Sequence, residues 1–350
     1  MGICEKKRKE LEMELKDTIM RLSSVSGASG SENRASQLAL EMLKEYCPDA
    51  YIINDCVIGA FGEYKEGLPH LLLDAHIDQI GMIVTYITDE GFIKCGNLGG
   101  IDRRLLPAQQ VVIHGKEDIK GIICSVPPHL SGGEGKVLSF DDIAIDTGMS
   151  RNELEGVVSL GDSITFDVKP KELLGNRITG GAMDDRCGVA SILYALELLK
   201  GKETNYNITV LFSTQEELGE RGAKISAYSI NPDIALAVDV SFAYAIGETE
   251  HKCGYLAKGP MIGISPSLSR EISDKLIDTA VKKDIPYQLE VMNGLTSTNA
   301  DRFSVNREGA KACTVSIPLR YMHTPVEVID VEDVRLTGKL IAEFCVKGEQ

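Results

Sequence analysis

The chain has 350 residues, more than one hydrophobic core usually serves, so two domains are expected rather than one. Hydrophobic residues make up 43% and charged residues 25% of the sequence, which is typical of a folded globular protein. The net charge of -15 argues against binding to a nucleic-acid backbone, which requires basic patches. The sequence has no apolar run of about 18 residues, so no membrane span is expected.

The N-terminal residues and the cysteines favour a cytoplasmic location. Charged residues near Met1 are not followed by an apolar segment, so no secretory signal is expected. The nine cysteines form no C-x-x-C pair, and most lie in apolar runs, which predicts reduced, buried thiols rather than disulfides or thiolate-bound zinc. The cysteines are Cys4, Cys47, Cys56, Cys95, Cys124, Cys187, Cys253, Cys313 and Cys345.

The first half of the chain changes character near residue 80. Apolar residues at helical spacing predict helices over 8–24 and 32–46, and strands are expected near 51–56 and 70–75. Between 80 and 174, short β runs alternate with turns and almost no helix pattern is visible, which predicts a small β-barrel or sandwich. The expected strands there are 82–87, 91–94, 110–114, 121–125, 156–158 and 163–168.

After residue 174 strands and helices alternate, which indicates an α/β fold with a mostly parallel sheet. We therefore expect one catalytic domain, formed by 1–79 and 175–350, interrupted by an inserted β domain at 80–174. The elements expected in the second part are helices over 185–199, 219–228, 269–283 and 331–346, and strands over 208–214, 234–239 and 286–291.

Acidic residues and histidines stand at several predicted strand ends, where a fold normally avoids burying charge. Each one alone could be a helix cap or a hydrogen-bonded core residue. Because sites in open α/β sheets form beyond the carboxyl ends of the strands, the set together predicts the ligands of a two-metal hydrolase. The candidates are His76, Asp78, Asp184, Asp185, Glu216, Glu217, Asp239 and His323.

Two spacings within this set suggest roles. His76 and Asp78 are two residues apart, so on an extended backbone both side chains point the same way, and one can orient the other. Asp184 and Asp185 open a predicted helix, so one can cap the helix while the other is free to bridge two metals.

Four segments resemble the tetrahedral aminopeptidases, also called glutamyl aminopeptidases, some of which are labelled endoglucanases. They are 173–177, 184–186, 215–223 and 317–325, and the resemblance extends from about Leu22 to Ile341. It implies a di-metal α/β catalytic domain with an inserted β domain for dimerisation, peptide substrates, and assembly of dimers into a tetrahedral dodecamer.

The resemblance also implies roles for individual residues. Asp184 would bridge two divalent metal ions, for which zinc, cobalt or manganese suit histidine and carboxylate ligands. Glu217 and His323 would complete one metal site, and His76 and Asp239 the other. Asp78 would orient His76, and Glu216 would be the general base. This chain has Ile101 where the family often has Trp, and Asn299 within a segment where the family often has Gly-Thr-Asp-Ala.

The sequence thus predicts a metal-dependent aminopeptidase in which Asp185 and Glu216 are free to bind the substrate's α-amine. The alternative is a carboxypeptidase or deacylase on the same fold, with Arg186 or Arg320 binding a substrate carboxylate. Glycoside hydrolysis is disfavoured because the chain has no Trp to stack against sugars. An inactive structural shell would be expected to lack ligands, and all the expected ligands are present.

Overall fold

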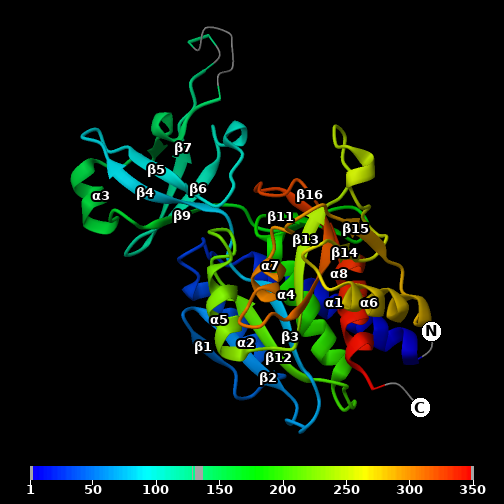
Figure 1. Cartoon of the computed structure of the whole chain (residues 1–350). Coiled ribbons are helices and arrows are strands. Elements are labelled where there is room, and N and C mark those ends of the chain that lie inside the picture. Colours follow the sequence, from blue (N-terminus) through cyan, green and yellow to red (C-terminus); the bar gives the residue numbers. More distant parts are fainter. Residues whose placement is uncertain (1–2, 128, 131–136, 348–350) are drawn as a thin grey trace.

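The computed structural model describes residues 3–127, 129–130 and 137–347, with side chains described from residue 13 onward. The chain forms an α/β unit and a separate β-barrel, which lies at one end of the sheet (Figure 1). The barrel strands all come from the chain between His76 and Lys171. No helix in the described ranges is long and apolar enough to cross a membrane.

The barrel is closed by six strands of the described chain, in the order β4-β5-β8-β7-β6-β9. Its interior is a separate apolar core that includes Met82, Val111 and Ile164. The strands are β4 (Gly81–Ile87), β5 (Ile93–Leu98), β6 (Gln110–His114), β7 (Asp118–Ile123), β8 (Ile145–Asp146) and β9 (Ser163–Phe166).

One predicted barrel strand is wrong. Residues 156–158 were expected as a strand, but the helix α3 (Arg151–Val157) covers most of that segment. Glu153 accepts a hydrogen bond of 2.8 Å from the Ser150 backbone N–H, which forms a capping box and starts the helix. Two short 3-10 helices, η1 (Arg103–Leu105) and η2 (Phe140–Asp142), lie in the loops of the barrel.

The α/β unit is built on a mixed sheet of eleven strands among the described residues. Its centre, β12-β3-β13-β16, is parallel as predicted, while the flanking pairs are mostly antiparallel. The central strands are β12 (Asn207–Ser213), β3 (His70–His76), β13 (Ile234–Phe242) and β16 (Lys311–Arg320). The flanking strands are β1 (Tyr51–Ile53), β2 (Cys56–Phe61), β10 (Lys171–Glu172), β11 (Arg177–Gly180), β14 (Met261–Ile264), β15 (Gln288–Val291) and β17 (Glu327–Asp330).

Helices cover the two faces of this sheet unequally. The larger apolar core lies under α1 (Ile3–Ser23), α2 (Asn33–Leu43), α4 (Met183–Leu199), α6 (Arg270–Lys282) and α8 (Val331–Cys345). A smaller core lies under α5 (Arg221–Ile230) and α7 (Ala300–Ser304), and a further 3-10 helix, η3 (Glu250–Lys252), follows β13. Along β13, Leu236 and Val238 belong to the first core, and Ala235 and Ala237 to the second. By this alternation, Asp239 lies on the face covered by α5 and α7.

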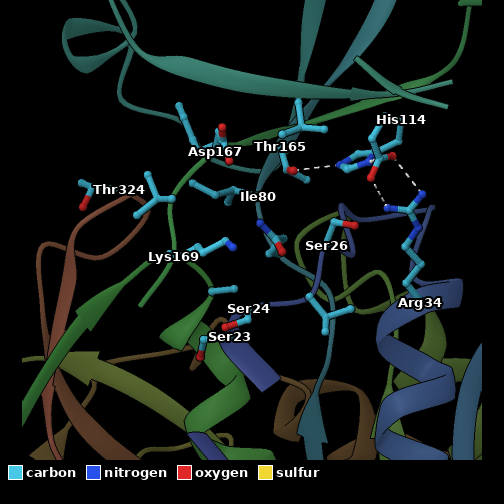
Figure 2. A pocket seen from close by; sticks show the side chains of 18 residues that line it. Ser23, Ser24, Ser26, Arg34, Ile80, His114, Thr165, Asp167, Lys169 and Thr324 are labelled. Carbon is cyan, nitrogen blue, oxygen red and sulfur yellow. Dashed lines mark hydrogen bonds and ion pairs between the residues drawn. The ribbon is translucent and has the colours of Figure 1, made fainter. Parts of the chain in front are cut away.

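Polar contacts join the barrel to the α/β unit. Arg34 on α2 forms a two-pronged ion pair with Asp118 on β7, with distances of 2.6 and 2.9 Å. His114 contacts Asp118 at 2.9 Å. It also contacts Thr165 at 2.9 Å, as a dashed line in Figure 2 shows. These residues border a cavity of about 320 Å³ between the two units, and no candidate ligand lines it.

A fully buried arginine connects the helices to the end of β3. Arg186 on α4 donates hydrogen bonds to three backbone carbonyls, those of Leu22 in the last turn of α1, Val25 just after α1, and Ile77 just after β3. Because this guanidinium serves the backbone and is not exposed, the expectation that Arg186 is available to a substrate carboxylate is wrong. The other candidate, Arg320, donates through Nε to the Tyr244 carbonyl at 2.7 Å.

Replacing Arg186 by Met should therefore destabilise the fold rather than alter substrate choice. The three carbonyls would lose their donor, and unsatisfied buried acceptors cost about 1–3 kcal/mol each. We expect the free energy of unfolding to fall by at least about 3 kcal/mol, measured by urea denaturation. Arg270→Met, which removes an exposed helix ion pair, is the control and should cost less than about 1 kcal/mol. Equal losses in the two variants would contradict this role.

Candidate metal centre

The sheet delivers the candidate ligands to one edge. His76 is the last residue of β3, and its partner on β12 is Ser213, the last residue of that strand. Glu216 and Glu217 follow β12 in a turn that begins at Gln215, whose φ is +53°. Asp239 lies on β13, which continues to Phe242. The carboxyl ends of parallel strands meet at one edge of a sheet, so these side chains converge there.

The first group of ligands contains His76, Asp184 and Asp239, all buried. The His76 Nε2 atom lies 3.0 Å from Asp184 Oδ1 and 3.9 Å from Asp239 Oδ1. One ligand atom from each residue lies within 4.8 Å of the others, a spacing that suits a single cation. Burial, together with the charges of the neighbouring Asp184 and Glu217, raises the pKa of Asp239 to about 8.

The second group contains Asp184, Glu217 and His323. The His323 Nε2 atom lies 3.3 Å from Glu217 Oε1 and 3.5 Å from Asp184 Oδ2. Asp184 thus turns one oxygen toward each histidine, and it belongs to both groups. Burial alone would raise the pKa of Asp184, but hydrogen bonds with His323 and His76 lower it overall.

Asp78 holds together the two segments that carry these residues. Its carboxylate accepts backbone N–H bonds from Glu216 at 3.0 Å and from Glu217 at 3.2 Å. The same carboxylate lies 3.4 Å from His76 Nδ1, the ring nitrogen that faces away from Asp184. It can therefore fix both the tautomer of His76 and the position of the two glutamates.

Glu216 directly precedes the candidate ligand Glu217, and no hydrogen bond or ion pair of its carboxylate is found among the described residues. Burial raises the pKa of this carboxyl group to about 9, and the surrounding carboxylates contribute to the rise. A carboxyl group next to a metal site but outside its ligand set is suited to exchange a proton with a reactant.

A further acidic residue, Glu327 on β17, was missed by sequence reasoning. Its carboxylate is buried and accepts backbone N–H bonds from Met183 at 2.9 Å, Asp184 at 3.3 Å and His323 at 3.0 Å. It therefore sets the position of two candidate ligands that are far apart in the chain. No sequence signal singles out this residue, because an acid four positions after His323 in a turn is ordinary.

Asp185 differs from the expectation that it binds a substrate amine. It is fully buried, and its Oδ1 accepts the Gly188 backbone N–H at 3.1 Å, as a helix cap does. The peptide bond between Asp184 and Asp185 is cis. Asp185 thus supports the start of α4 and is not exposed to a substrate amine.

Asn299, which differs from the family pattern, contacts the strands that carry the site. Asn299, at the start of α7, donates hydrogen bonds to Asp74 on β3 at 2.7 Å and to Ser213 at 2.8 Å, and it is almost fully buried. Asp74 and Ser213 are next to His76 in the sheet, so the Asn299 amide fixes the ends of β3 and β12, where His76 lies. The other departure, Ile101, packs against the barrel core.

The barrel also approaches the ligands. A Cβ atom at Gly99 would lie 2.9 Å from Glu217 Oε2, and one at Gly100 would lie 2.8 Å from His323 Nδ1. Both glycines follow β5. The absence of side chains at 99 and 100 thus leaves room for two candidate ligands where the barrel meets the α/β unit.

The residues present fit two divalent cations. Several carboxylates are buried here around two imidazoles, and such a concentration of negative charge is costly unless cations compensate it. Histidine nitrogen and carboxylate oxygen are common ligands of zinc and related metals. Each of the two groups offers three ligands and shares Asp184, the arrangement of a bridged pair of metals.

Comparisons with known proteins agree with this geometry. Residues 56–340 match the family model of the M42 glutamyl aminopeptidases, and this is most of the chain. The chain belongs to the M42 glutamyl aminopeptidase family. It is a metal-dependent aminopeptidase, a hydrolase of peptide bonds.

Members of the M42 family with related sequences and structures come from several archaea. The lysyl aminopeptidase of Pyrococcus furiosus is 30% identical over 321 residues, which cover 90% of this chain and 92% of that protein. The aminopeptidase of Desulfurococcus kamchatkensis has a TM-score of 0.90 and 34% identity, over 96% of each chain. The TET1 peptidase of Pyrococcus horikoshii has a TM-score of 0.83 and 30% identity, over 95% of this chain and 99% of that one.

Glu327→Gln tests how far the backbone bonds position the M42 site. The amide offers one acceptor oxygen in place of two, so at least one of the three N–H donors loses its partner. We expect metal affinity to fall about 10- to 100-fold, the usual effect of removing a group that orients ligands, with the fold retained. Competition with a chelator, followed by metal analysis, measures this. The exposed Glu308→Gln is the control, and unchanged affinity in Glu327→Gln would contradict the positioning role.

Proposed function

We propose that this enzyme holds two divalent cations and uses Glu216 as its general base to release N-terminal residues from peptides. Asp184 would bridge the cations. Glu217 and His323 would complete one site, and His76 and Asp239 the other. The observation that carries the proposal is the position of Asp184, whose two oxygens face the two histidines.

In the proposed mechanism, cations at these sites supply Lewis-acid polarisation of the scissile carbonyl. The chain's own residues do the rest. Asp78 holds His76 and the backbone at 216–217, so the carboxylate of Glu216 stays close to the reacting carbonyl. Glu216 takes the proton from the attacking water and passes it to the leaving amine. Burial of the site keeps bulk water away from the proton during this transfer.

The donor set suits zinc or cobalt, and also manganese, because histidine and carboxylate ligands accept all three. A cytoplasmic location agrees with the thiols, since the cysteines of the described chain are free and most are buried.

The proposed assembly is a tetrahedral dodecamer built from dimers through the barrel. The TET1 peptidase of Pyrococcus horikoshii can assemble into a tetrahedron or a large octahedral shell. The barrel of the present chain exposes large apolar side chains, including Tyr86, Ile122 and Leu160, of the kind that interfaces cover.

Light scattering of the intact protein tests the assembly. We expect a particle about twelve times heavier than the 38.0 kDa chain, because the exposed barrel surface is buried between copies. A monodisperse monomer at micromolar concentration would contradict assembly, and a stable dimer would contradict only the shell.

Glu216→Gln should separate proton transfer from metal binding. The amide cannot accept the proton, so we expect activity to fall about 10²- to 10⁴-fold while both metals remain bound. Metal analysis of the purified variant, together with hydrolysis of an aminoacyl anilide, measures both. Asp184→Ala is the contrasting variant and should lose metal from both sites. Loss of metal from Glu216→Gln would mean that Glu216 is a ligand.

The position of cleavage tests the aminopeptidase chemistry on this chain. A free α-amine can form charge-assisted hydrogen bonds with the carboxylates beside the metals, and an acetyl group removes that charge. We expect a short peptide to be shortened one residue at a time from its N-terminus and its N-acetylated form to resist. Mass spectrometry follows both. A ladder growing from the C-terminus would instead support a carboxypeptidase, although Arg186 is buried away from any substrate.

A further inference from the structure

A second carboxylate system lies beside the metal centre. Glu290 on β15 is half-buried, and its two oxygens accept hydrogen bonds from two serine hydroxyls. The Ser316 Oγ donates at 2.7 Å, and the Ser241 Oγ donates to the other oxygen. Both serines are buried, so the carboxylate is held by groups inside the protein rather than on its surface.

The two serines place Glu290 close to Asp239. Ser241 is two residues after Asp239 on β13, so its side chain is on the same face, about 7 Å further along the strand. Ser316 is the register partner of Asp239 on the neighbouring strand β16, about 4.8 Å away and on the same face. The two serines that bind Glu290 are thus both neighbours of Asp239: Ser241 along the same strand, and Ser316 on the adjacent strand.

Strand β14, which separates Glu290 on β15 from Ser316 on β16, leaves room for the Glu290 side chain. β14 lies between β15 and β16, and the register partner of Glu290 on β14 is Gly263. A Cβ atom at Gly263 would come within 2.0 Å of Thr314 Oγ1, so this position admits no side chain. The Glu290 side chain can therefore extend across β14 toward Ser316 and Ser241 without an obstacle at that pleat.

The charge of Glu290 has no cationic partner among the described residues. Only hydroxyl groups donate to it, and no lysine, arginine or histidine forms an ion pair with it. Two hydroxyl donors leave part of the carboxylate's hydrogen-bonding capacity unused. This differs from Asp78 and Glu327, which are bonded to backbone N–H groups and hold the chain in place.

We infer that Glu290 selects substrates whose N-terminal residue is basic, lysine or arginine, by pairing with the side-chain cation. This inference rests on the proposed function, in which the scissile carbonyl lies at the metals beside Asp239. The side chain of the N-terminal residue is attached one bond from that carbonyl, so it must extend into the immediate surroundings of Asp239. The four-carbon stem of lysine can span from the metals to the Glu290 carboxylate, which is hydrogen-bonded to Ser241, two residues beyond Asp239 on β13.

The pairing also explains why a carboxylate is suited to this position. A half-buried anion held by neutral donors alone is incompletely compensated, and an incoming ammonium or guanidinium completes its shell with charge-assisted hydrogen bonds. An uncharged N-terminal side chain would leave the carboxylate as it is, and an acidic one would meet electrostatic repulsion.

Lysyl and norleucyl p-nitroanilides provide a direct test, because the two side chains are similar in length and differ in the terminal charge. We expect the wild-type enzyme to have at least about a tenfold higher kcat/KM for the lysyl substrate. Glu290→Gln should lower kcat/KM for lysyl and arginyl substrates about 10- to 100-fold, the usual range for a lost charge-assisted hydrogen bond. The norleucyl rate should change less than about threefold, since the metal centre is untouched.

Three further measurements sharpen the outcome. Glu290→Lys should reverse the order, so that a glutamyl anilide is cleaved faster than a lysyl one. Glu248→Gln, which removes an exposed carboxylate in the loop after β13, is the matched control and should leave the lysyl-to-norleucyl ratio unchanged. With the wild-type enzyme alone, lysinol should inhibit norleucyl hydrolysis at lower concentration than norleucinol does, which requires no variant to fold.

Several results would overturn the inference. One is equal wild-type hydrolysis of lysyl and norleucyl substrates, and another is an equal fall of both rates in Glu290→Gln, which would mean a purely structural role. Either result leaves the aminopeptidase function intact, because norleucyl release still reports it. An enzyme with bound metals that releases no anilide would contradict the proposed function and the inference together.

Discussion

The cost of burying several carboxylates within a few ångströms of each other is the constraint on which the rest of this structure depends. Such a cluster is unstable unless cations or many hydrogen-bond donors compensate it. The protein supplies two imidazoles and leaves Asp184 between them, with one oxygen toward each. The fold then has to hold these groups in place when their mutual repulsion would separate them.

The surrounding structure meets this requirement largely with backbone amides. Asp78 accepts hydrogen bonds from the backbone N–H groups of Glu216 and Glu217. Glu327 accepts them from the backbone N–H groups of Asp184 and His323. These bonds join turns that come from different strands, so Asp184, Glu217 and His323 each depend on an anion elsewhere in the site. Arg186 also stabilises this arrangement, because it donates a hydrogen bond to the carbonyl of Ile77, the residue between His76 and Asp78.

The sequence predicted the candidate metal ligands better than the residues that position them. His76, Glu217 and Asp239 could be recognised because strand ends in an α/β fold converge, and charge after an apolar strand is unusual. Glu327 could not, since its role depends on three amides that only folding brings together. Arg186 was considered as a substrate contact because a carboxypeptidase needs a cation for the substrate carboxylate, while its actual partners are carbonyls distant in the chain.

The strands, too, differ in how well the sequence predicts them. The hairpin of β1 and β2 turns at Asn54 and Asp55, both with positive φ, but sequence reasoning merged it into a single strand. Strand β16 was missed because it is buried on both faces and shows no alternation, so periodicity gives no signal. The parallel centre of the sheet was predicted correctly, because alternating strands and helices require crossover connections.

The barrel and the metal centre are linked through Gly99 and Gly100. Both positions lie against candidate ligands, so the loop after β5 forms one wall of the site. In the proposed assembly through the barrel, packing between copies is coupled to the metal centre, because any shift of the barrel changes the space beside Glu217 and His323. The ion pair of Arg34 with Asp118 is a second contact between the barrel and the α/β unit, near the cavity shown in Figure 2.

The carboxylates around the site differ in what donates to them, and that difference assigns their work. Those bonded by amides, such as Asp78 and Glu327, are fully engaged and hold the chain in place. Asp184, between two imidazoles, suits cations. Glu290 receives only two hydroxyl bonds, which stabilise the anion without neutralising it, and it faces the same side of the sheet as Asp239. Beside the proposed substrate site, an acid whose charge is not neutralised is the group through which a sequence change can alter substrate preference while the metal ligands stay the same.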